Sequence, residues 1–415
     1  MVRIGHTVVV VRRVVITGMG VLSPLGPSLA ATWAGLLAGE SGIRALDAFA
    51  NQPVRIGGVV PDFVPAAEMD AKTARQLDRF AALAVVAARD AVAQAGFAPG
   101  PRTRWATVIG SGLGGLSTYE WALDALAVEG RVSPFTATGT IANAGAAAVA
   151  RDHGAQGPSI CPVSAGATGT DAIGMGADLI RMGRADVVLA GGADAPLTRG
   201  LLAGLAATGA ASTRNDDPQG ACRPFAEDRD GLVAGEGAAV LVLESYDDAV
   251  ARGAVPLAEV AGYAATNDAF HLTAPRPDGS TQAAAMHEAL LEAGVVPEEV
   301  GYVNAHGTAT RRGDEVEAQV IAAAVGSATP VSSTKSMTGH LMGAAGAVEA
   351  AVCVQVLRTG LIPATRNLDK VDPACGVVDL LRQGAVAADV EVVVSNSFGF
   401  AGHNAVLVLR RIVQQ

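Results

Sequence analysis

The chain has 415 residues, half of them hydrophobic and 17% charged, and its net charge is −10. This composition excludes a disordered chain, and the acidic balance argues against a general nucleic-acid-binding protein. The length predicts two domains or two fused half-domains. The four cysteines, Cys161, Cys222, Cys353 and Cys375, form no CxxC pair. We therefore expect neither a metal site nor a disulfide scaffold, and a reducing cytoplasm fits better.

Residues 1–12 form an N-terminal extension of unknown order. Its apolar run is interrupted by Arg12 and Arg13 and has no small-residue cleavage site, so it does not resemble a secretory signal. The β-branched run 14–16, followed by a glycine turn at 17–20, predicts a buried strand. No stretch of about 20 apolar residues occurs, so no membrane-spanning segment is expected.

Strand-like runs then alternate with alanine-rich helical runs. Strands are predicted at 106–109, 186–190 and 239–243, and a helix is predicted over 80–95. This alternation is typical of an α/β protein with buried sheets. The segment 110–115 (GSGLGG) matches G-x-G-x-x-G, but Glu129 does not end a strand as a dinucleotide site requires. With 50 glycines in the chain, we interpret this segment as a close-packed turn.

A faint internal repeat divides the chain near residue 250. Residues 164–169 open a helix that runs to about 182, and residues 336–340 open a similar helix that ends near 360. Each half closes with a hydrophobic strand, at 239–243 and at 404–409. The repeat predicts two similar halves, 13–250 and 251–415, that pack as one body.

Two histidines stand in motifs that suggest chemistry. His306 follows the predicted strand at 302–303 among small residues, where it can approach a ligand; the alternative is a core histidine bonded to the backbone. Lys335 and His340 lie on the turn before a helix, whose start offers free N–H groups. Glu349 inside that helix needs a partner, and Lys335 is a natural one; the alternative is a surface ion pair.

A glycine between two phenylalanines follows the predicted strand at 392–394. Phe398, Gly399 and Phe400 suggest either a mobile aromatic gate or a loop whose backbone N–H faces a ligand. The alternative is a hydrophobic hairpin.

Together these motifs resemble the β-ketoacyl-acyl-carrier-protein synthases, most closely the elongating type of fatty acid synthesis and type II polyketide synthesis. The resemblance covers about residues 13–410 and rests on residues 14–20, 215–218, 223–225, 228–231, 235–237, 306–308, 335–340 and 396–402. It implies a thiolase-like α/β fold, in which two similar halves form a five-layered αβαβα body that is usually dimeric. It also implies a cytoplasmic acyltransferase without a cofactor of its own, because its substrates are carried on the phosphopantetheine of an acyl carrier protein.

The resemblance also assigns roles. In the family, a cysteine at a buried helix start takes the acyl chain, and two histidines bind the malonyl thioester and promote loss of carbon dioxide. By position, His306 and His340 match these histidines, while Lys335 and Glu349 match the pair that supports them. Phe400 matches a gating residue whose backbone N–H helps to build an oxyanion hole. The remaining substrate-binding positions are Phe398, Gly399, Thr308 and Thr273.

The chain departs from this pattern at the nucleophile. Gly166, within the sequence SAGATG at 164–169, stands where the family has cysteine. Cys161 lies on the incoming strand and is interpreted as a buried core cysteine, while the offset of Ser164 points its side chain elsewhere. A glycine cannot form an acyl-enzyme. We therefore predict that this chain does not condense acyl groups by the usual two-step route.

Three explanations of Gly166 compete. An engineered Cys→Gly change would empty the nucleophile position and suit trapping of a carrier-protein complex, and the intact remainder of the site favours this explanation. A natural malonyl-carrier-protein decarboxylase is the second, although relatives of that kind usually place glutamine there. A non-catalytic chain-length factor is the third, although such subunits typically lose the histidines. A thiolase is disfavoured because the loop 396–402 has no cysteine, and a purely carrier-binding protein is the non-enzyme alternative.

Carrier proteins are acidic, so a partner of this kind requires a local basic patch on an acidic chain. The candidates are placed on a predicted helix start and two further segments: Lys72, Arg75, Arg79, Arg131 and Arg214. The alternative is ordinary solvated charge. The expected partners are an acyl carrier protein and either a second copy of this chain or a chain-length factor, with neither nucleic acid nor membrane. The sequence does not distinguish fatty acid from polyketide synthesis.

Overall fold

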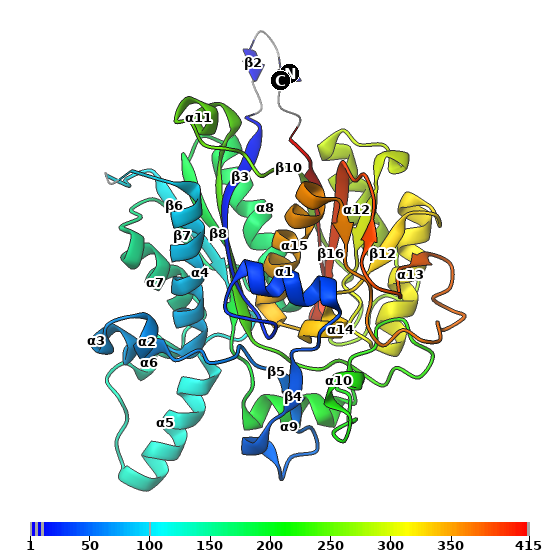
Figure 1. Ribbon diagram of the computed structural model, residues 1–415. Coiled ribbons are helices and arrows are strands. Elements are labelled where there is room, and N and C mark those ends of the chain that lie inside the picture. The colour runs from blue at the N-terminus through cyan, green and yellow to red at the C-terminus, as the bar shows by residue number, and fades with distance from the viewer. Residues whose placement is uncertain (1, 5–6, 10–11, 99–100, 413–415) are drawn as a thin grey trace.

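The protein is built around one large mixed sheet. The computed structural model describes residues 2–4, 7–9, 12–98 and 101–412. In these residues an 11-stranded sheet has the order β14-β12-β11-β16-β17-β10-β3-β9-β8-β6-β7 (Figure 1). In chain order its strands are β3 (Val14–Leu22), β6 (Trp105–Gly110), β7 (Ser159–Ile160), β8 (Val187–Asp194), β9 (Gly237–Ser245), β10 (Ala258–Asn267), β11 (Tyr302–Asn304), β12 (Pro330–Ser332), β14 (Asp379–Leu380), β16 (Val392–Phe398) and β17 (His403–Arg410).

The sheet repeats one topology twice. In the first half the order is β3-β9-β8-β6-β7, and in the second it is β10-β17-β16-β11-β12. In each half, the first three strands pair antiparallel and the next two add parallel. The halves join where Ala258 and Glu259 of β10 pair with Ile16 and Val15 of β3. The predicted pair of similar halves is thus confirmed.

The two halves of the sheet form two β layers, and helices between and outside them complete the five layers α, β, α, β and α. The central layer is formed by α8 (Thr168–Arg181) and α15 (Ala345–Thr359), which contact each other and both halves of the sheet. The outer face of the first half is covered by α4 (Arg79–Ala95) and α7 (Ala144–His153). On the second half, α12 (Ser280–Ala293) packs on the sheet with α13 (Arg311–Val325) beside it (Figure 1).

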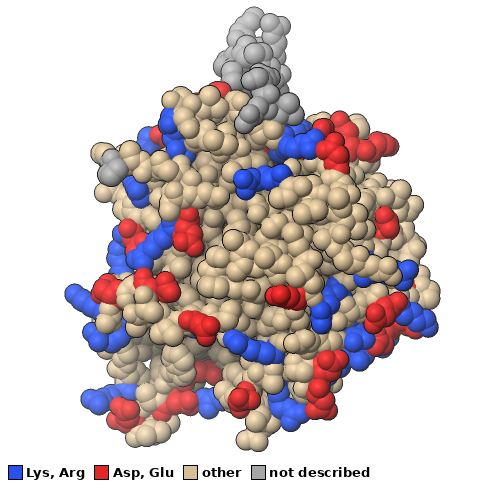
Figure 2. All heavy atoms as spheres, in the orientation of Figure 1, with Lys and Arg blue, Asp and Glu red and all other residues tan. Residues whose placement is uncertain are grey.

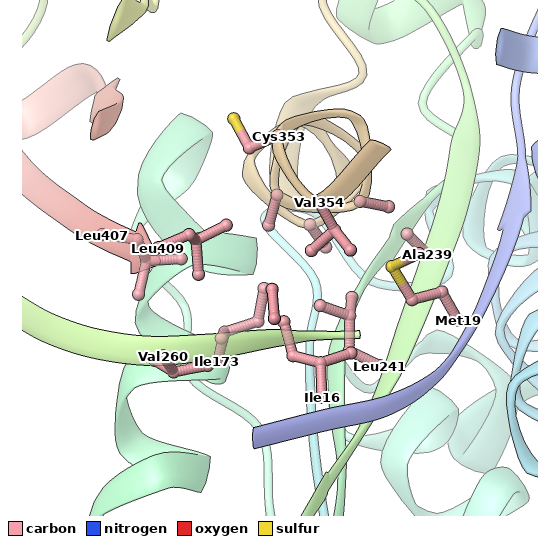
Figure 3. Close-up of a cluster of buried hydrophobic side chains, with 14 of the residues drawn as sticks. Ile16, Met19, Ile173, Ala239, Leu241, Val260, Cys353, Val354, Leu407 and Leu409 are labelled. Atoms are coloured by element: carbon pink, nitrogen blue, oxygen red, sulfur yellow. The ribbon is translucent and has the colours of Figure 1, made fainter. Parts of the chain in front are cut away.

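The core between the sheets is continuous across the two halves. Figure 3 shows Ile173 of α8 and Val354 of α15 among sheet residues that include Leu241 of β9 and Leu407 of β17. All four side chains are fully buried. The alanine and glycine content of α8 and α15 lets the two helices approach each other and the sheets closely, which places the first turns of both helices side by side.

Shorter elements surround this body. Within the N-terminal extension, β1 (Val2–Ile4) pairs antiparallel with β2 (Thr7–Val9). The other helices are α1 (Leu29–Ala38), α2 (Pro65–Glu68), α3 (Ala71–Ala74), α5 (Leu116–Glu129), α6 (Thr136–Thr140), α9 (Arg199–Thr208), α10 (Pro218–Ala221), α11 (Tyr246–Ala251) and α14 (Lys335–Thr338). Two-stranded sheets form from β4 (Ile43–Ala45) with β5 (Ile56–Gly58) and from β13 (Leu361–Ile362) with β15 (Val386–Ala387). The 3₁₀ turns are η1 (Asp47–Phe49), η2 (Ala165–Ala167), η3 (Pro297–Glu299), η4 (Met342–Ala344) and η5 (Phe400–Gly402).

The surface carries charges of both signs. Figure 2 shows basic and acidic side chains intermingled on one face, around a broad area that carries neither. In the described part of the chain, no helix is both long and apolar enough to cross a membrane.

Close approach of β3 to α4 generates a stability prediction. A Cβ on Gly20 would lie 2.0 Å from the carbonyl oxygen of Ala87, so Gly20→Ala must push strand and helix apart. We expect the free energy of unfolding to fall by about 1–3 kcal/mol or more in urea titrations. The control is Gly204→Ala on α9, where a Cβ meets no atom within 4 Å and alanine favours the helix by about 0.5–1 kcal/mol. Equal stabilities of the two variants would contradict this account.

Candidate active site

A cavity of about 440 Å³ leads from the surface to the predicted site residues. Its inner end is formed by Gly166, His306 and His340, which are buried. Exposed residues line its outer end, and these are Thr208, Gly209, Thr273, Arg311, Arg312 and Phe400. The structure thus brings together residues from both halves of the chain.

Gly166 faces the two histidines directly. It lies in η2, the turn between β7 and α8, where the preceding Ala165 has a φ of 51°. A Cβ on Gly166 would lie 3.0 Å from Nε2 of His340 and 3.2 Å from Cε1 of His306. The centroids of the two imidazole rings are 5.2 Å apart. A side chain at position 166 would therefore point between the two rings.

His340 is held as a neutral imidazole of defined tautomer. Its backbone N–H donates to the carbonyl oxygen of Val233 at 2.7 Å, and its Nδ1 accepts from the backbone N–H of Met342 at 3.3 Å. Because Nδ1 is an acceptor, Nε2 carries the hydrogen and can donate it into the cavity. Burial lowers the pKa of His340 well below its ordinary value, and the nearby charge of Lys335 lowers it further.

His306 is positioned through its backbone. Oε1 of Glu317 accepts from the N–H of His306, and Oε2 accepts from the N–H of Gly307, both at 2.7 Å. Its Nδ1 is buried without a hydrogen-bond partner. Burial first, then the charge of Lys335 and the neighbouring His340, lower the pKa of His306 well below its ordinary value. Both rings are therefore neutral hydrogen-bonding groups at neutral pH.

Lys335 and Glu349 form a buried ion pair. Nζ of Lys335 lies 2.5 Å from Oε1 of Glu349, and the two side chains are 1% and 3% exposed. Burial raises the pKa of Glu349 to about 7, and the ammonium of Lys335 opposes this shift. This geometry differs from a surface ion pair, because neither charge can be solvated.

The loop after β16 packs against the turn that holds Gly166. A Cβ on Gly399 would lie 2.7 Å from the carbonyl oxygen of Ser164 and 3.0 Å from the backbone N of Gly166. The ring centroid of Phe398 lies 6.2 Å from that of His306. Phe400 is 36% exposed at the cavity wall. Only glycine at 399 allows this contact, since any side chain would collide with the turn.

The two threonines line the same cavity at different depths. Thr308 is buried, and its backbone N–H donates to the carboxylate of Asp314 at 3.0 Å. Thr273 is exposed near the outer end, where its backbone N–H donates to Nδ1 of His271. Both positions therefore face a ligand that enters the cavity.

Sequence reasoning missed three buried carboxylates that organise the site. Glu317 anchors the histidine loop, and Asp314 accepts the backbone N–H groups of Thr308 and Phe225. Asp194 accepts backbone N–H groups of Gly112 and Gly343 at 2.9 and 2.6 Å, which ties the two halves together beside the site. Burial raises the pKa of Asp194 to about 6 and that of Asp314 to about 7. The sequence did contain one signal for these residues, since the i, i+3 spacing of Asp314 and Glu317 places both on one face of a helix.

The alternative nucleophiles lie outside the cavity wall. The hydroxyl of Ser164 donates to the carboxylate of Asp171, and neither residue lines the cavity. Cys161 follows β7 and is partly rather than fully buried: it packs against the core of the first half, and its thiol donates to the carbonyl oxygen of Ala142 at 3.3 Å. Partial burial still raises the pKa of the Cys161 thiol.

The predicted docking residues lie on several elements, and their docking role stays a prediction. The guanidinium of Arg79 bonds both carboxylate oxygens of Glu236, at 2.8 and 2.6 Å. Lys72 and Arg75 are exposed, but they lie on α3 and its end rather than on the helix that Arg79 begins. The remaining two are partnered by acids: Arg131 by Glu129, and Arg214 by Asp228 and Asp230.

Comparisons with known sequences identify the class of protein. "Beta-ketoacyl synthase, N-terminal domain" matches residues 11–249, and "Beta-ketoacyl synthase, C-terminal domain" matches residues 257–369. The chain is 44% identical over 409 residues to 3-oxoacyl-[acyl-carrier-protein] synthase 2 of Staphylococcus aureus (strain COL), covering 96% of this chain and 98% of the relative. The corresponding synthase of Vibrio cholerae is 43% identical over 411 residues, covering 97% and 99%. The chain belongs to the β-ketoacyl synthase family, whose members are acyltransferases.

Solved structures agree with this placement. A β-ketoacyl synthase from Burkholderia phymatum STM815 superposes with a TM-score of 0.91 at 38% identity, covering 97% of this chain and all of that one. The ishigamide ketosynthase/chain length factor gives 0.90 at 36% identity, with the same coverage. AntDE:AntF, a type II polyketide acyl-carrier protein in complex with its ketosynthase, gives 0.89 at 30%, again covering 97% and 100%. These neighbours establish the thiolase-like ketosynthase fold.

The buried ion pair generates a stability prediction. Glu349→Gln leaves the ammonium of Lys335 buried without a counter-charge, so the free energy of unfolding should fall by about 3–5 kcal/mol. The double variant Lys335→Met, Glu349→Met buries no charge and should recover most of this loss. Urea unfolding followed by circular dichroism measures both. A double variant less stable than Glu349→Gln alone would contradict the account.

The lowered histidine pKa values generate a second prediction. A lowered pKa means that the neutral form persists at lower pH, so neither ring should gain a proton between pH 8 and pH 6. Their nitrogen resonances in ¹H–¹⁵N spectra, assigned with the variants His306→Asn and His340→Asn, should not move over this range. A titration midpoint at the ordinary value of 6.5 would show that the rings are solvated.

Proposed function

We propose that this chain binds malonyl units on an acyl carrier protein in type II fatty acid or polyketide synthesis, with the acyl-enzyme half of the ketosynthase reaction disabled. The observation that carries the proposal is the position of Gly166, whose missing side chain would lie within 3.0–3.2 Å of both histidine rings. The two histidines that would bind the malonyl unit, His306 and His340, are present, whereas position 166 has no thiol.

The histidines can promote decarboxylation of a bound malonyl thioester. Nε2–H of His340 donates to the thioester carbonyl, so the electron pair released as the carboxylate carbon leaves is stabilised as an enolate. The bond between the carboxyl carbon and the α-carbon breaks, carbon dioxide departs, and a proton from water yields the acetyl thioester. Neutral rings suit this role, since they donate a hydrogen bond without holding the substrate carboxylate as an ion pair.

Transfer of an acyl chain to the protein cannot follow. A glycine offers no nucleophile, and Ser164 is engaged with Asp171. The intact histidines and the Lys335–Glu349 pair support a Cys-to-Gly variant of a condensing enzyme, suited to trapping a carrier-protein complex. The same residues support the second candidate, a natural malonyl-carrier-protein decarboxylase. They disfavour a chain-length factor, because such a subunit has no use for paired histidines.

The proposed partners follow from the solved neighbours and the surface. Neighbours include ketosynthases in complex with an acyl-carrier protein and with a chain length factor. Helix α5, which projects from the body in Figure 1, exposes Trp121, Leu126 and Val128, as expected of a surface that a second subunit covers. We propose a dimer with a second copy or a chain-length factor. All four cysteines are free, which supports a cytoplasmic protein, and no cofactor is required beyond the carrier's own arm.

Restoring the thiol tests the proposal. We expect the unchanged chain to gain no acyl mass when it is incubated with an acyl carrier protein, while Gly166→Cys gains one acyl group. The new Cβ would lie 3.0 Å from Nε2 of His340, so the imidazole must shift by a few tenths of an ångström to accommodate it. Intact-mass spectrometry measures acylation, and β-ketoacyl product measures condensation. An acylated unchanged chain would sink the proposal.

The matched control is Gly166→Ala, which adds the same Cβ without a thiol. It should remain unacylated and should still release carbon dioxide from malonyl carrier protein. His340→Ala should release carbon dioxide at least tenfold more slowly, because a hydrogen-bond donor to a developing oxyanion typically contributes roughly 100-fold or more to the rate. Equal release by His340→Ala and the unchanged chain would remove the histidines from the reaction.

A further inference from the structure

Asp194 is a buried carboxylate to which the proposed reaction assigns no part. It is the last residue of β8 in the first half of the chain, is 0% exposed and is not among the residues that line the cavity. Its Oδ1 accepts from the hydroxyl of Ser111 at 2.5 Å and from the backbone N–H of Leu113 at 3.3 Å. Its Oδ2 accepts from the backbone N–H groups of Gly112 and Gly343, at 2.9 and 2.6 Å. A buried charge needs such donors, so the carboxylate fixes the segments to which they belong.

These segments come from both halves of the chain. Gly112 lies in the glycine-rich loop that follows β6, whereas Gly343 lies in η4, the turn before α15. A Cβ on Gly343 would lie 2.5 Å from the backbone N of Gly112 and 2.6 Å from Oδ2 of Asp194. The two backbones therefore touch at this point. The glycine-rich loop, which lacks the features of a dinucleotide site, closes around Asp194 and packs on η4.

The turn η4 in its turn positions the ring of His340. The backbone N–H of Met342, the first residue of η4, donates to Nδ1 of His340 at 3.3 Å. This is the one hydrogen bond of the imidazole within the described part of the chain, and it leaves the hydrogen on Nε2. Met342 has a φ of 50°, a left-handed conformation that is strained for a residue with a side chain. Such a turn persists only where neighbouring contacts enforce it, and the next residue is bound by Asp194.

We infer that Asp194 is a positioning residue for His340, acting through its hydrogen bond to Gly343. The bond holds η4 in its strained turn, and the turn places the N–H of Met342 on Nδ1. The first half of the chain thereby sets the hydrogen position of a histidine in the second half. The effect of Asp194 on the ring is independent of the proposed function, and only its effect on the reaction rate rests on that function.

The test is Asp194→Asn, which keeps the size of the side chain and removes its charge. An amide cannot accept all three backbone N–H groups, because its nitrogen is itself a donor. Burial raises the pKa of Asp194 to about 6, so the carboxylate is ionised at pH 8, where the comparison is made. The ¹⁵N resonances of the His340 ring, assigned with His340→Asn, should show a population with hydrogen on Nδ1 that the unchanged chain lacks.

The same variant should release carbon dioxide from malonyl carrier protein more slowly. We expect kcat to fall about three- to tenfold, because a hydrogen bond to a charged acceptor is stronger than one to a neutral amide. KM should not change, since Asp194 lies outside the cavity and acts on a group that stabilises the transition state.

The matched control is Asp78→Asn. Asp78 is also a buried carboxylate of the first half, 2% exposed, and it accepts the backbone N–H groups of Phe80 and Thr118 at 3.1 and 2.8 Å. It does not line the cavity. Asp78→Asn should lose stability in urea titrations, as Asp194→Asn should, while kcat and the ring resonances of His340 stay unchanged. Equal effects of the two variants on the ring would reduce Asp194 to a structural residue and overturn the inference.

A second variant, Gly343→Ala, breaks the same contact from the other side and decides the question if Asp194→Asn does not fold. Its new Cβ must push η4 away from Asp194 while the carboxylate keeps its charge. The ring of His340 should respond as it does to Asp194→Asn, and an unchanged ring in either folded variant would overturn the inference. An unchanged chain that releases no carbon dioxide would remove the proposed function, yet a ring that responds to Asp194→Asn would leave the positioning role standing.

Discussion

Lys335, the first residue of α14, is 1% exposed, and the site around it is arranged to accommodate the single charge of its ammonium group. Glu349 compensates it at 2.5 Å, and without that carboxylate the lysine would lose its proton or the helix its place. The same charge lowers the pKa of both histidines, in addition to the effect of burial. Burial first and the Lys335 charge second therefore keep both rings neutral.

The backbone geometry of the loops around the cavity is the second constraint on the site. Four loops converge on the cavity, and each has a non-glycine residue with positive φ: Ala165, Ala309, Met342 and Ala401. Such conformations cost about 1–3 kcal/mol each and persist only where surrounding contacts enforce them. At two of these loops buried carboxylates supply such contacts: Asp194 binds the N–H of Gly343 beside Met342, and Glu317 binds the N–H of His306 in the loop of Ala309. The buried acids thus stabilise strained backbone conformations next to the cavity.

Much of the scaffold was predictable because it rests on local patterns. The predicted strands at 106–109 and 239–243 lie in β6 and β9, and the one at 186–190 starts one residue before β8, since continuous apolar runs leave few alternatives. The residues that assemble the site were harder to predict from the sequence. The segment from Arg311 to Glu317 holds five charged side chains, and periodicity alone does not say that Asp314 and Glu317 turn inward. The ion pair of Arg79 was not foreseen for the same reason, because its partner Glu236 is 157 residues away.

The side chain at position 166 does not hold this scaffold together, because the hydrogen bonds that position the histidines do not involve residue 166. His306 is fixed by Glu317, and His340 by Val233 and Met342, so each keeps its place whether or not a side chain fills the space between them. Gly399 packs on backbone atoms of the turn, not on a side chain of residue 166. Acyl transfer and handling of the malonyl unit are therefore structurally separable. Under the proposed function, a glycine at 166 removes the first and leaves the geometry of the second intact.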